Sequence, residues 1–247
     1  FGKECLGALQ KEGVATEFIR VHPAIKTNYH YVLWYLDDRT ILIKHEEFPY
    51  TLPEINDPKW IYLSSLGEHS LDFHNILEGY LKSHPAVKLA FQPGTFQMKL
   101  GWEKLKYFYE RSDIFFCNIQ EAQRILGTTD EDIKKLLHFV NRIGPKTVVI
   151  TDGPQGAYAL HEGISWSMAI YPDPKPPFER TGAGDAFSST FAVALALGLS
   201  IEDALKWAPI NAMAVVQKIG AREGLLTRRE LEEFLKKAPI GYRPKPI

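Results

Sequence analysis

The sequence predicts an α/β fold in which a mostly parallel sheet carries helices on both faces. Within residues 60–151, short apolar segments alternate with segments of helical pattern, an order typical of parallel sheets. The apolar segments are continuous runs, as expected for strands covered on both faces. With 247 residues, 45% hydrophobic and 24% charged, the chain is long enough for one large domain. We therefore expect residues 1–247 to form a single domain.

Residues 1–44 predict a short helix followed by a small antiparallel β element. Residues 2–10 are amphipathic, and three segments rich in β-branched and aromatic residues follow. These segments are 17–21, 29–36 and 40–44, with Asp37-Asp38-Arg39 as a turn between the last two. Such a hairpin often acts as a lid over a site, and an edge strand packed on the core has the same pattern. We expect a lid-like β element around 17–44, with the edge-strand interpretation open.

The elements of the main sheet follow in order. The predicted strands are 60–64, 87–91, 114–117 and 146–151, and the predicted helices are 69–83, 99–109, 119–126 and 131–143. A hairpin over 156–161 and 164–170 turns at Glu162-Gly163. A proline-rich connector, 172–177, leads to three further helices at 183–197, 201–219 and 227–237.

Composition excludes several classes of partner. The formal net charge is −1, so the chain lacks the basic field that attracts nucleic acid or anionic lipid. The most apolar run, 191–199, is about half the ~20 residues that a membrane span needs. Cys5 and Cys117 are too few for a disulfide framework, which suits a reducing compartment. We expect a cytoplasmic protein that binds small molecules, without nucleic acid or membrane partners.

The segment 179–187, Glu-Arg-Thr-Gly-Ala-Gly-Asp-Ala-Phe, carries the strongest chemical signal. Gly182, Ala183 and Gly184 allow a tight turn with converging N–H groups, and the helix that starts there adds its positive dipole end. Such a place binds anions. Asp185 falls in the first helical turn, where its carboxylate can accept a proton from a hydroxyl beside an arriving phosphoryl group. This arrangement predicts a kinase site.

Two other interpretations of this motif exist. The turn can simply start a helix, with Asp185 satisfying free N–H groups. It can also begin a dinucleotide fingerprint, G-x-G-x-x-G, but Phe187 stands at the third glycine position. The acidic residues at the expected distance, Glu202 and Asp203, open a helix instead of ending a strand.

Polar residues also follow two other predicted strands. Asn118 and Glu121 come after the strand that ends at Cys117, at the carboxyl edge where parallel sheets bind ligands. Their spacing is that of a capping box, and a cap is compatible with Glu121 holding a metal-bound water.

The next strand end is followed by Thr151, Gly153 and Gly156, in a segment that fits a simple turn or a nucleotide loop. Asn211 lies in a later helix, just beyond Pro209, where a kink is expected. It can border an adenine or only pack.

Together these motifs resemble the ribokinase-type (PfkB) carbohydrate kinase family. The match covers most of the chain: G-A-G-D at 182–185, N-x-x-E at 118–121, T-x-G-x-x-G at 151–156, and the segment 219–226. The resemblance implies a ribokinase-like, Rossmann-like fold and transfer of the γ-phosphoryl group of ATP to a sugar hydroxyl, with Mg²⁺. The implied roles are Asp185 as base; Gly182, Ala183 and Gly184 as anion hole; Glu121 and Asn118 at the Mg²⁺-water and phosphates; Thr151, Gly153 and Gly156 at the nucleotide, with Asn211 as a further candidate contact.

The chain departs from the family pattern in several places. Gln92 begins a Q-P-G-T segment where relatives have Asn, and Glu179-Arg180 stands where they have Asp-Thr. The Asp of relatives can help hold a monovalent cation, so K⁺ is an optional cofactor here. Thr190 occupies a position that is usually Gly.

Relatives carry roughly fifty or more residues ahead of the position matched by Phe1, including a Gly-Gly motif that contacts the sugar. We therefore expect residues 1–247 alone to have an incomplete sugar pocket, at most weak ATP binding and negligible sugar kinase activity. The expected activity is that of a fructokinase or ribokinase; the alternatives are a nucleoside kinase of the same family or a nucleotide-binding protein without turnover. The lid-like hairpin can pair two subunits in a homodimer.

Overall fold

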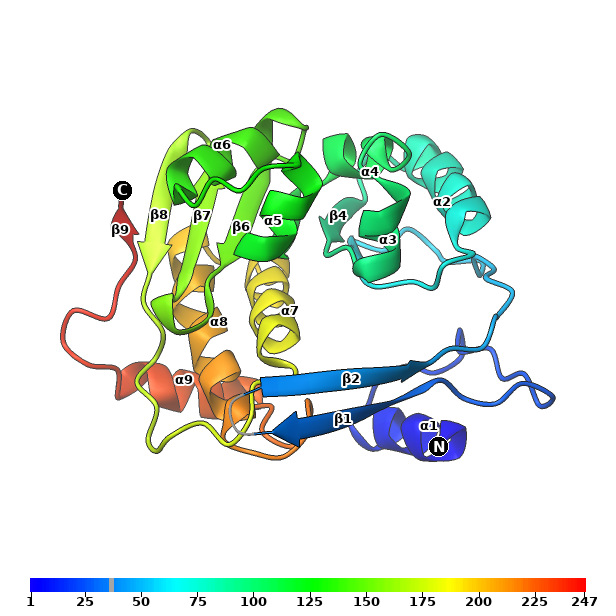
Figure 1. Ribbon diagram of the computed structural model, residues 1–247, viewed down its shortest axis with the longest axis horizontal. Coiled ribbons are helices and arrows are strands. Elements are labelled where there is room, and N and C mark those ends of the chain that lie inside the picture. Colours follow the sequence, from blue (N-terminus) through cyan, green and yellow to red (C-terminus); the bar gives the residue numbers. More distant parts are fainter. Residues whose placement is uncertain (36–37) are drawn as a thin grey trace. The chain divides into compact units, whose positions relative to one another are not determined.

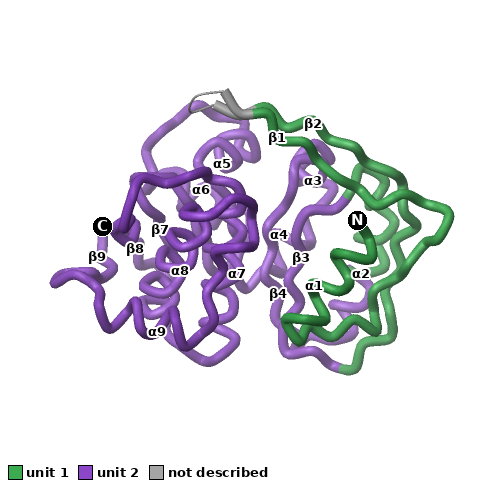
Figure 2. Tube along the Cα trace, turned by 90° about the horizontal axis from the view of Figure 1, so that it is seen from below, with its two compact units in different colours: residues 1–56, 67–77 green, residues 57–66, 78–247 purple. Residues whose placement is uncertain are grey.

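The structure is a computed structural model that describes residues 1–35 and 38–247. Its elements are α1 (Gly2–Lys11), β1 (Tyr29–Tyr35), β2 (Asp38–Lys44), β3 (Trp60–Leu63), α2 (Leu71–Ser83), β4 (Lys88–Phe91), α3 (Thr95–Leu100), α4 (Lys106–Arg111), β5 (Ile114–Asn118), α5 (Ile119–Leu126), α6 (Ile133–Arg142), β6 (Thr147–Thr151), a short 3₁₀ helix (Gly153–Gln155), β7 (Ala157–His161), β8 (Ile164–Met168), α7 (Ala183–Ala196), α8 (Ile201–Val216), α9 (Arg228–Lys236) and β9 (Lys245–Pro246) (Figure 1). The chain divides into two compact units, one of residues 1–56 and 67–77 and one of 57–66 and 78–247 (Figure 2). The single-domain organisation stays a prediction.

The larger unit is built on a sheet that has, in the described part of the chain, the strand order β3-β4-β5-β6-β7-β8-β9. The strands β3 to β6 pair in parallel, and β7, β8 and β9 extend the sheet antiparallel. Helices α5 and α6 lie on one face and α7 and α8 on the other (Figure 1). Leu89, Phe115 and Val149, on three neighbouring strands, are completely buried. The predicted fold class is confirmed.

Helix α7 is anchored by aromatic packing against the sheet. Phe191 is fully buried, and its ring centroid lies 5.7 Å from that of Phe116 in β5. Phe187, one turn earlier, stacks on Phe191 with centroids 6.2 Å apart. Burial of such a side chain contributes about 1.5–3 kcal/mol, so the start of α7 is fixed relative to the strand ends.

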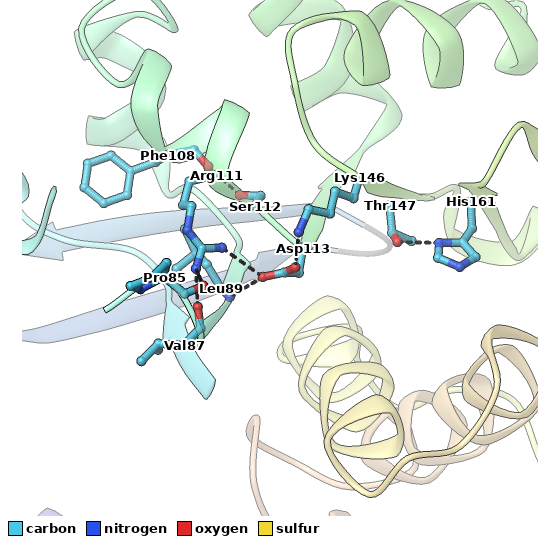
Figure 3. A network of polar contacts seen from close by, with 10 residues as sticks. All are labelled: Pro85, Val87, Leu89, Phe108, Arg111, Ser112, Asp113, Lys146, Thr147 and His161. Carbon is cyan, nitrogen blue, oxygen red and sulfur yellow. Dashed lines mark hydrogen bonds and ion pairs between the residues drawn. The ribbon is translucent and has the colours of Figure 1, made fainter. Parts of the chain in front are cut away.

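A network of ion pairs and hydrogen bonds connects the amino-terminal ends of the parallel strands (Figure 3). Asp113 precedes β5; its Oδ2 accepts from the Leu89 N–H at 2.9 Å and lies 3.2 Å from Arg111 Nη1, and its Oδ1 lies 2.8 Å from Lys146 Nζ. Arg111 also donates to the carbonyl oxygens of Pro85, at 2.9 Å, and Val87. The starts of β4, β5 and β6 are thereby held together, away from the edge that carries the predicted site.

Two predicted elements of the sequence are wrong. The helix expected over 99–109 is divided, because Gly101 adopts a φ of 89° and ends α3. Residues 17–21 form no strand: the Ile19 N–H bonds the Thr16 carbonyl in a local turn, and the side chain of Val21 is 69% exposed. A strand needs a partner for its backbone groups, and the periodicity of one segment does not supply it.

The smaller unit contains α1 and the antiparallel hairpin β1–β2, paired from Tyr29↔Lys44 to Tyr35↔Asp38. The predicted hairpin is therefore confirmed, but Asp38 and Arg39, expected in the turn, belong to β2. Asp37 of that turn and Leu36 of the preceding strand lie outside the described residues. Within the described ranges, no helix combines the length and apolar character needed to span a membrane.

Candidate active site

The turn before α7 has a backbone that only glycine fits well. Gly182 has a φ of 82°, and a Cβ built on it would lie 2.6 Å from the Cβ of Ala221. The segment containing Ala221 therefore packs directly behind the turn. The first N–H groups of α7 have no partners within the helix, so they and the helix dipole favour an anion at this place. Gly182, Ala183 and Gly184 form this turn and the start of α7.

Asp185 is exposed in the first turn of α7 and is held by a residue from another strand end. Its Oδ1 accepts a hydrogen bond of 3.0 Å from Nε2 of Gln92, which directly follows β4. Gln92 Oε1 accepts in turn from the hydroxyl of Tyr62 in β3. In the sequence, Gln92 stands out only as a departure from the family pattern, and Tyr62 carries no signal beyond its place near a strand end.

Asn118 and Glu121 form a reciprocal cap at the start of α5. The Glu121 N–H donates to Asn118 Oδ1 at 2.8 Å, and the Asn118 N–H donates to Glu121 Oε2 at 2.9 Å. Burial raises the pKa of the Glu121 carboxyl, and the negative charge of Asp185 raises it further. The hydrogen bond from the Asn118 N–H and the charge of Arg124 lower it. The two carboxylates are therefore close enough to influence each other, and the capping prediction is confirmed.

Thr151 ends β6 beside Asn118, with which it is in register. The segment that follows turns sharply: Gly153 and Gly156 have φ values of 50° and 103°, and a Cβ on Gly156 would lie 2.2 Å from the Met168 carbonyl oxygen. Nη1 of Arg180 lies 3.8 Å from the place of a Cβ on Gly153. This loop, the Asn118 cap and Asp185 thus lie at the carboxyl edge of the parallel strands.

Asn211 is placed differently. Its side chain is 7% exposed in α8; Nδ2 donates to the Thr190 hydroxyl at 2.8 Å, and Oδ1 accepts from the Leu226 N–H at 2.9 Å. Both ends of the amide are therefore used inside the protein. Thr190, which departs from the family pattern, supplies one of these partners.

Comparison with known proteins defines first the fold class and then the family. The structure superposes on Arabidopsis thaliana ribokinase complexed with ribose and ATP with a TM-score of 0.76 at 23% identity, covering 95% of this chain and 78% of that one. It superposes on Burkholderia thailandensis nucleoside kinase in complex with inosine with a TM-score of 0.78 at 18% identity, covering 97% of this chain and 78% of that one. At these identities the similarity shows the ribokinase-like fold.

Residues 1–228 match the pfkB family carbohydrate kinases, and the chain belongs to this family. It is 43% identical over 91 residues to ribokinase of Bacillus subtilis (strain 168), covering 37% of this chain and 30% of that protein. It is 25% identical over 235 residues to an uncharacterized sugar kinase of Archaeoglobus fulgidus, covering 91% of this chain and 90% of that protein. The resemblance found in the motifs is confirmed.

Proposed function

We propose that the protein is an ATP-dependent sugar kinase of the ribokinase or fructokinase type, which transfers the γ-phosphoryl group of ATP to a sugar hydroxyl. The observation that carries the proposal is Asp185, held by a hydrogen bond from Gln92 at the start of a helix whose first turn favours anions. Family membership supports it. A nucleoside kinase of the same family is the second candidate, supported by the similar fold of the nucleoside kinase.

In this proposal Asp185 accepts the proton of the sugar hydroxyl. At the same time the hydroxyl oxygen bonds to the γ-phosphorus of ATP, and the bond between the γ-phosphorus and the ADP oxygen breaks. The N–H groups around Gly182, Ala183 and Gly184 stabilise the negative charge on the transferred group. Thr151, Gly153 and Gly156 bind the nucleotide, with Asn118 near its phosphates. Arg180 beside Gly153 adds positive charge where phosphates are expected.

Asn211 is a further candidate contact for the nucleotide. Both ends of its amide are bonded inside the protein, which favours the alternative that it packs and holds α7, α8 and the segment before α9 together.

A magnesium ion fits the donor set at this edge. Among the described residues there is no group of three or more His, Cys, Asp or Glu side chains that can hold a metal. Mg²⁺ commonly keeps several waters and needs only one or two carboxylates beside substrate phosphates, a role that Glu121 suits. When bound, the ion neutralises phosphate charge. For a monovalent cation, Glu179 is the candidate, and its Oε1 already accepts from the Gly220 N–H.

A homodimer formed through β1 and β2 is also proposed. In this hairpin Tyr31, Leu33, Leu42 and Ile43 are each at least 50% exposed. Exposed apolar side chains gathered on one small sheet are typical of an interaction surface. Sedimentation of the full-length protein tests this, because a monomer at all concentrations contradicts it.

The activity is tested by ADP release from ATP and Mg²⁺ with a panel of sugars and nucleosides. Release that depends on ribose or fructose supports the sugar kinase, and release that depends only on nucleosides supports the second candidate. ATP binding without release on any acceptor contradicts both and indicates nucleotide binding without turnover.

A further inference from the structure

Three residues distant in the sequence form one hydrogen-bonded chain that ends on the proposed base. The Tyr62 hydroxyl bonds Gln92 Oε1, and Gln92 Nε2 bonds Asp185 Oδ1 at 3.0 Å. Tyr62 is paired with Ala90 in the neighbouring strand β4. Gln92 follows Ala90 by two residues, directly after β4 ends. The chain therefore runs from the sheet itself to the start of α7.

The far end of this chain is itself held in place. The Tyr62 ring stacks on Phe116, with centroids 6.3 Å apart and planes 25° from parallel, and Phe116 is 1% exposed in β5. Its hydroxyl also interacts with the Ser188 side chain, one turn after Asp185. Tyr62 is therefore fixed against both the sheet and α7.

The hydrogen bonds can run in only one direction. Burial raises the pKa of the Tyr62 hydroxyl, and the charge of Asp185 raises it further, so Tyr62 stays protonated and donates. The oxygen of the Gln92 amide must then face Tyr62, which turns the NH₂ group toward Asp185. An ionised carboxylate only accepts, so the direction is consistent along the whole chain.

We propose that Gln92 and Tyr62 are positioning residues that fix the Asp185 carboxylate through Oδ1 and leave Oδ2 to accept the proton of the acceptor hydroxyl. This rests on the proposed kinase function. Asp185 is exposed, and a free carboxylate there would rotate between conformers. A base already held in one orientation loses no conformational entropy when the substrate binds. Orientation matters, because misplacement by about 1 Å can cost up to ~10²-fold in rate.

The inference predicts a separation between turnover and nucleotide binding. In the full-length protein, Gln92→Leu should lower kcat about 10- to 100-fold, and Tyr62→Phe, which keeps the ring stacking, about 2- to 10-fold. The KM for ATP should change less than about 2-fold in both, because the hydrogen bonds of this chain contact none of the proposed nucleotide residues. Tyr171→Phe is the matched control: it removes a 2.9 Å hydroxyl bond to the Phe234 carbonyl, which takes no part in the Tyr62–Gln92–Asp185 hydrogen bonds, and should leave kcat unchanged.

Two further variants show whether Gln92 acts through Asp185. Gln92→Glu keeps the shape but places a carboxylate directly beside that of Asp185, so the acidic limb of the kcat–pH profile should move to higher pH. In an Asp185→Asn background, Gln92→Leu should have little further effect on kcat.

The outcomes are distinguishable. If the wild type is active and neither Gln92→Leu nor Tyr62→Phe lowers kcat, the positioning inference is overturned and the kinase assignment stands. An unmoved pH limb in Gln92→Glu likewise shows a merely structural role. Wild-type protein that releases no ADP with any acceptor overturns the proposed function and this inference together.

Discussion

Glu121 occupies two positions at once: the third residue of a helix cap and the carboxylate next to the proposed phosphate site. Glu121→Gln keeps an amide oxygen that can still accept from the Asn118 N–H. We expect the Mg²⁺ concentration for half-maximal activity to rise about 10-fold or more, with a stability loss below about 1 kcal/mol. Kinetics against Mg²⁺ and thermal unfolding measure the two effects.

The same cap elsewhere in the chain provides the control. Glu230 accepts from the Thr227 N–H at 2.8 Å in the capping box of α9. Glu230→Gln should produce a similar small stability loss and no change in the Mg²⁺ requirement. If the two variants show the same stability loss and the same Mg²⁺ requirement, Glu121 acts only as a helix cap.

His74 gives a pH dependence of stability. It is 1% exposed, and burial lowers the pKa of its imidazole from the ordinary 6.5. Above pH 6.5 the imidazole is neutral in both the folded and the unfolded state. Below pH 6.5 the unfolded state binds more protons, so the free energy of unfolding falls as the pH drops toward the lowered folded pKa. The slope is at most about 1.4 kcal/mol per pH unit. Denaturant unfolding between pH 8 and 5 measures this slope. His74→Gln should flatten it, and parallel curves for the two proteins would refute the assignment.

At the scale of elements, the two ends of α7 offer a matched pair of glycines. Gly182 and Gly198 have φ values of 82° and 81°, but a Cβ meets Ala221 at 2.6 Å in the first and nothing within 4 Å in the second. Gly198→Ala should therefore cost only the backbone strain, about 1 kcal/mol. Gly182→Ala should cost more and also lower kcat, because the turn must move away from Ala221. Equal melting temperatures and equal rates in the two variants would show that the turn has room to adjust.

At the scale of the whole molecule, local signals in the sequence predicted well what local forces determine. The parallel strands, the Asn118–Glu121 cap and the glycine turn before α7 each follow from neighbouring residues. One failure arose where distant groups decide: residues 17–21 have strand-like composition but no partner strand. The other was local, because Gly101 ends a helix by its own backbone conformation. The Tyr62–Gln92–Asp185 chain joins residues up to 123 positions apart, which no local pattern contains.

The central claim is that Asp185 is the base of a phosphoryl transfer to a sugar hydroxyl. Asp185→Asn keeps the shape of the side chain but removes the carboxylate that accepts the proton, so kcat should fall at least ~10²-fold while ATP affinity changes little. The most direct measurement is sugar-dependent ADP release by wild type and Asp185→Asn, with ATP binding followed in parallel by calorimetry. The account predicts lost turnover with retained binding; an Asp185→Asn protein that releases ADP at the wild-type rate would contradict it.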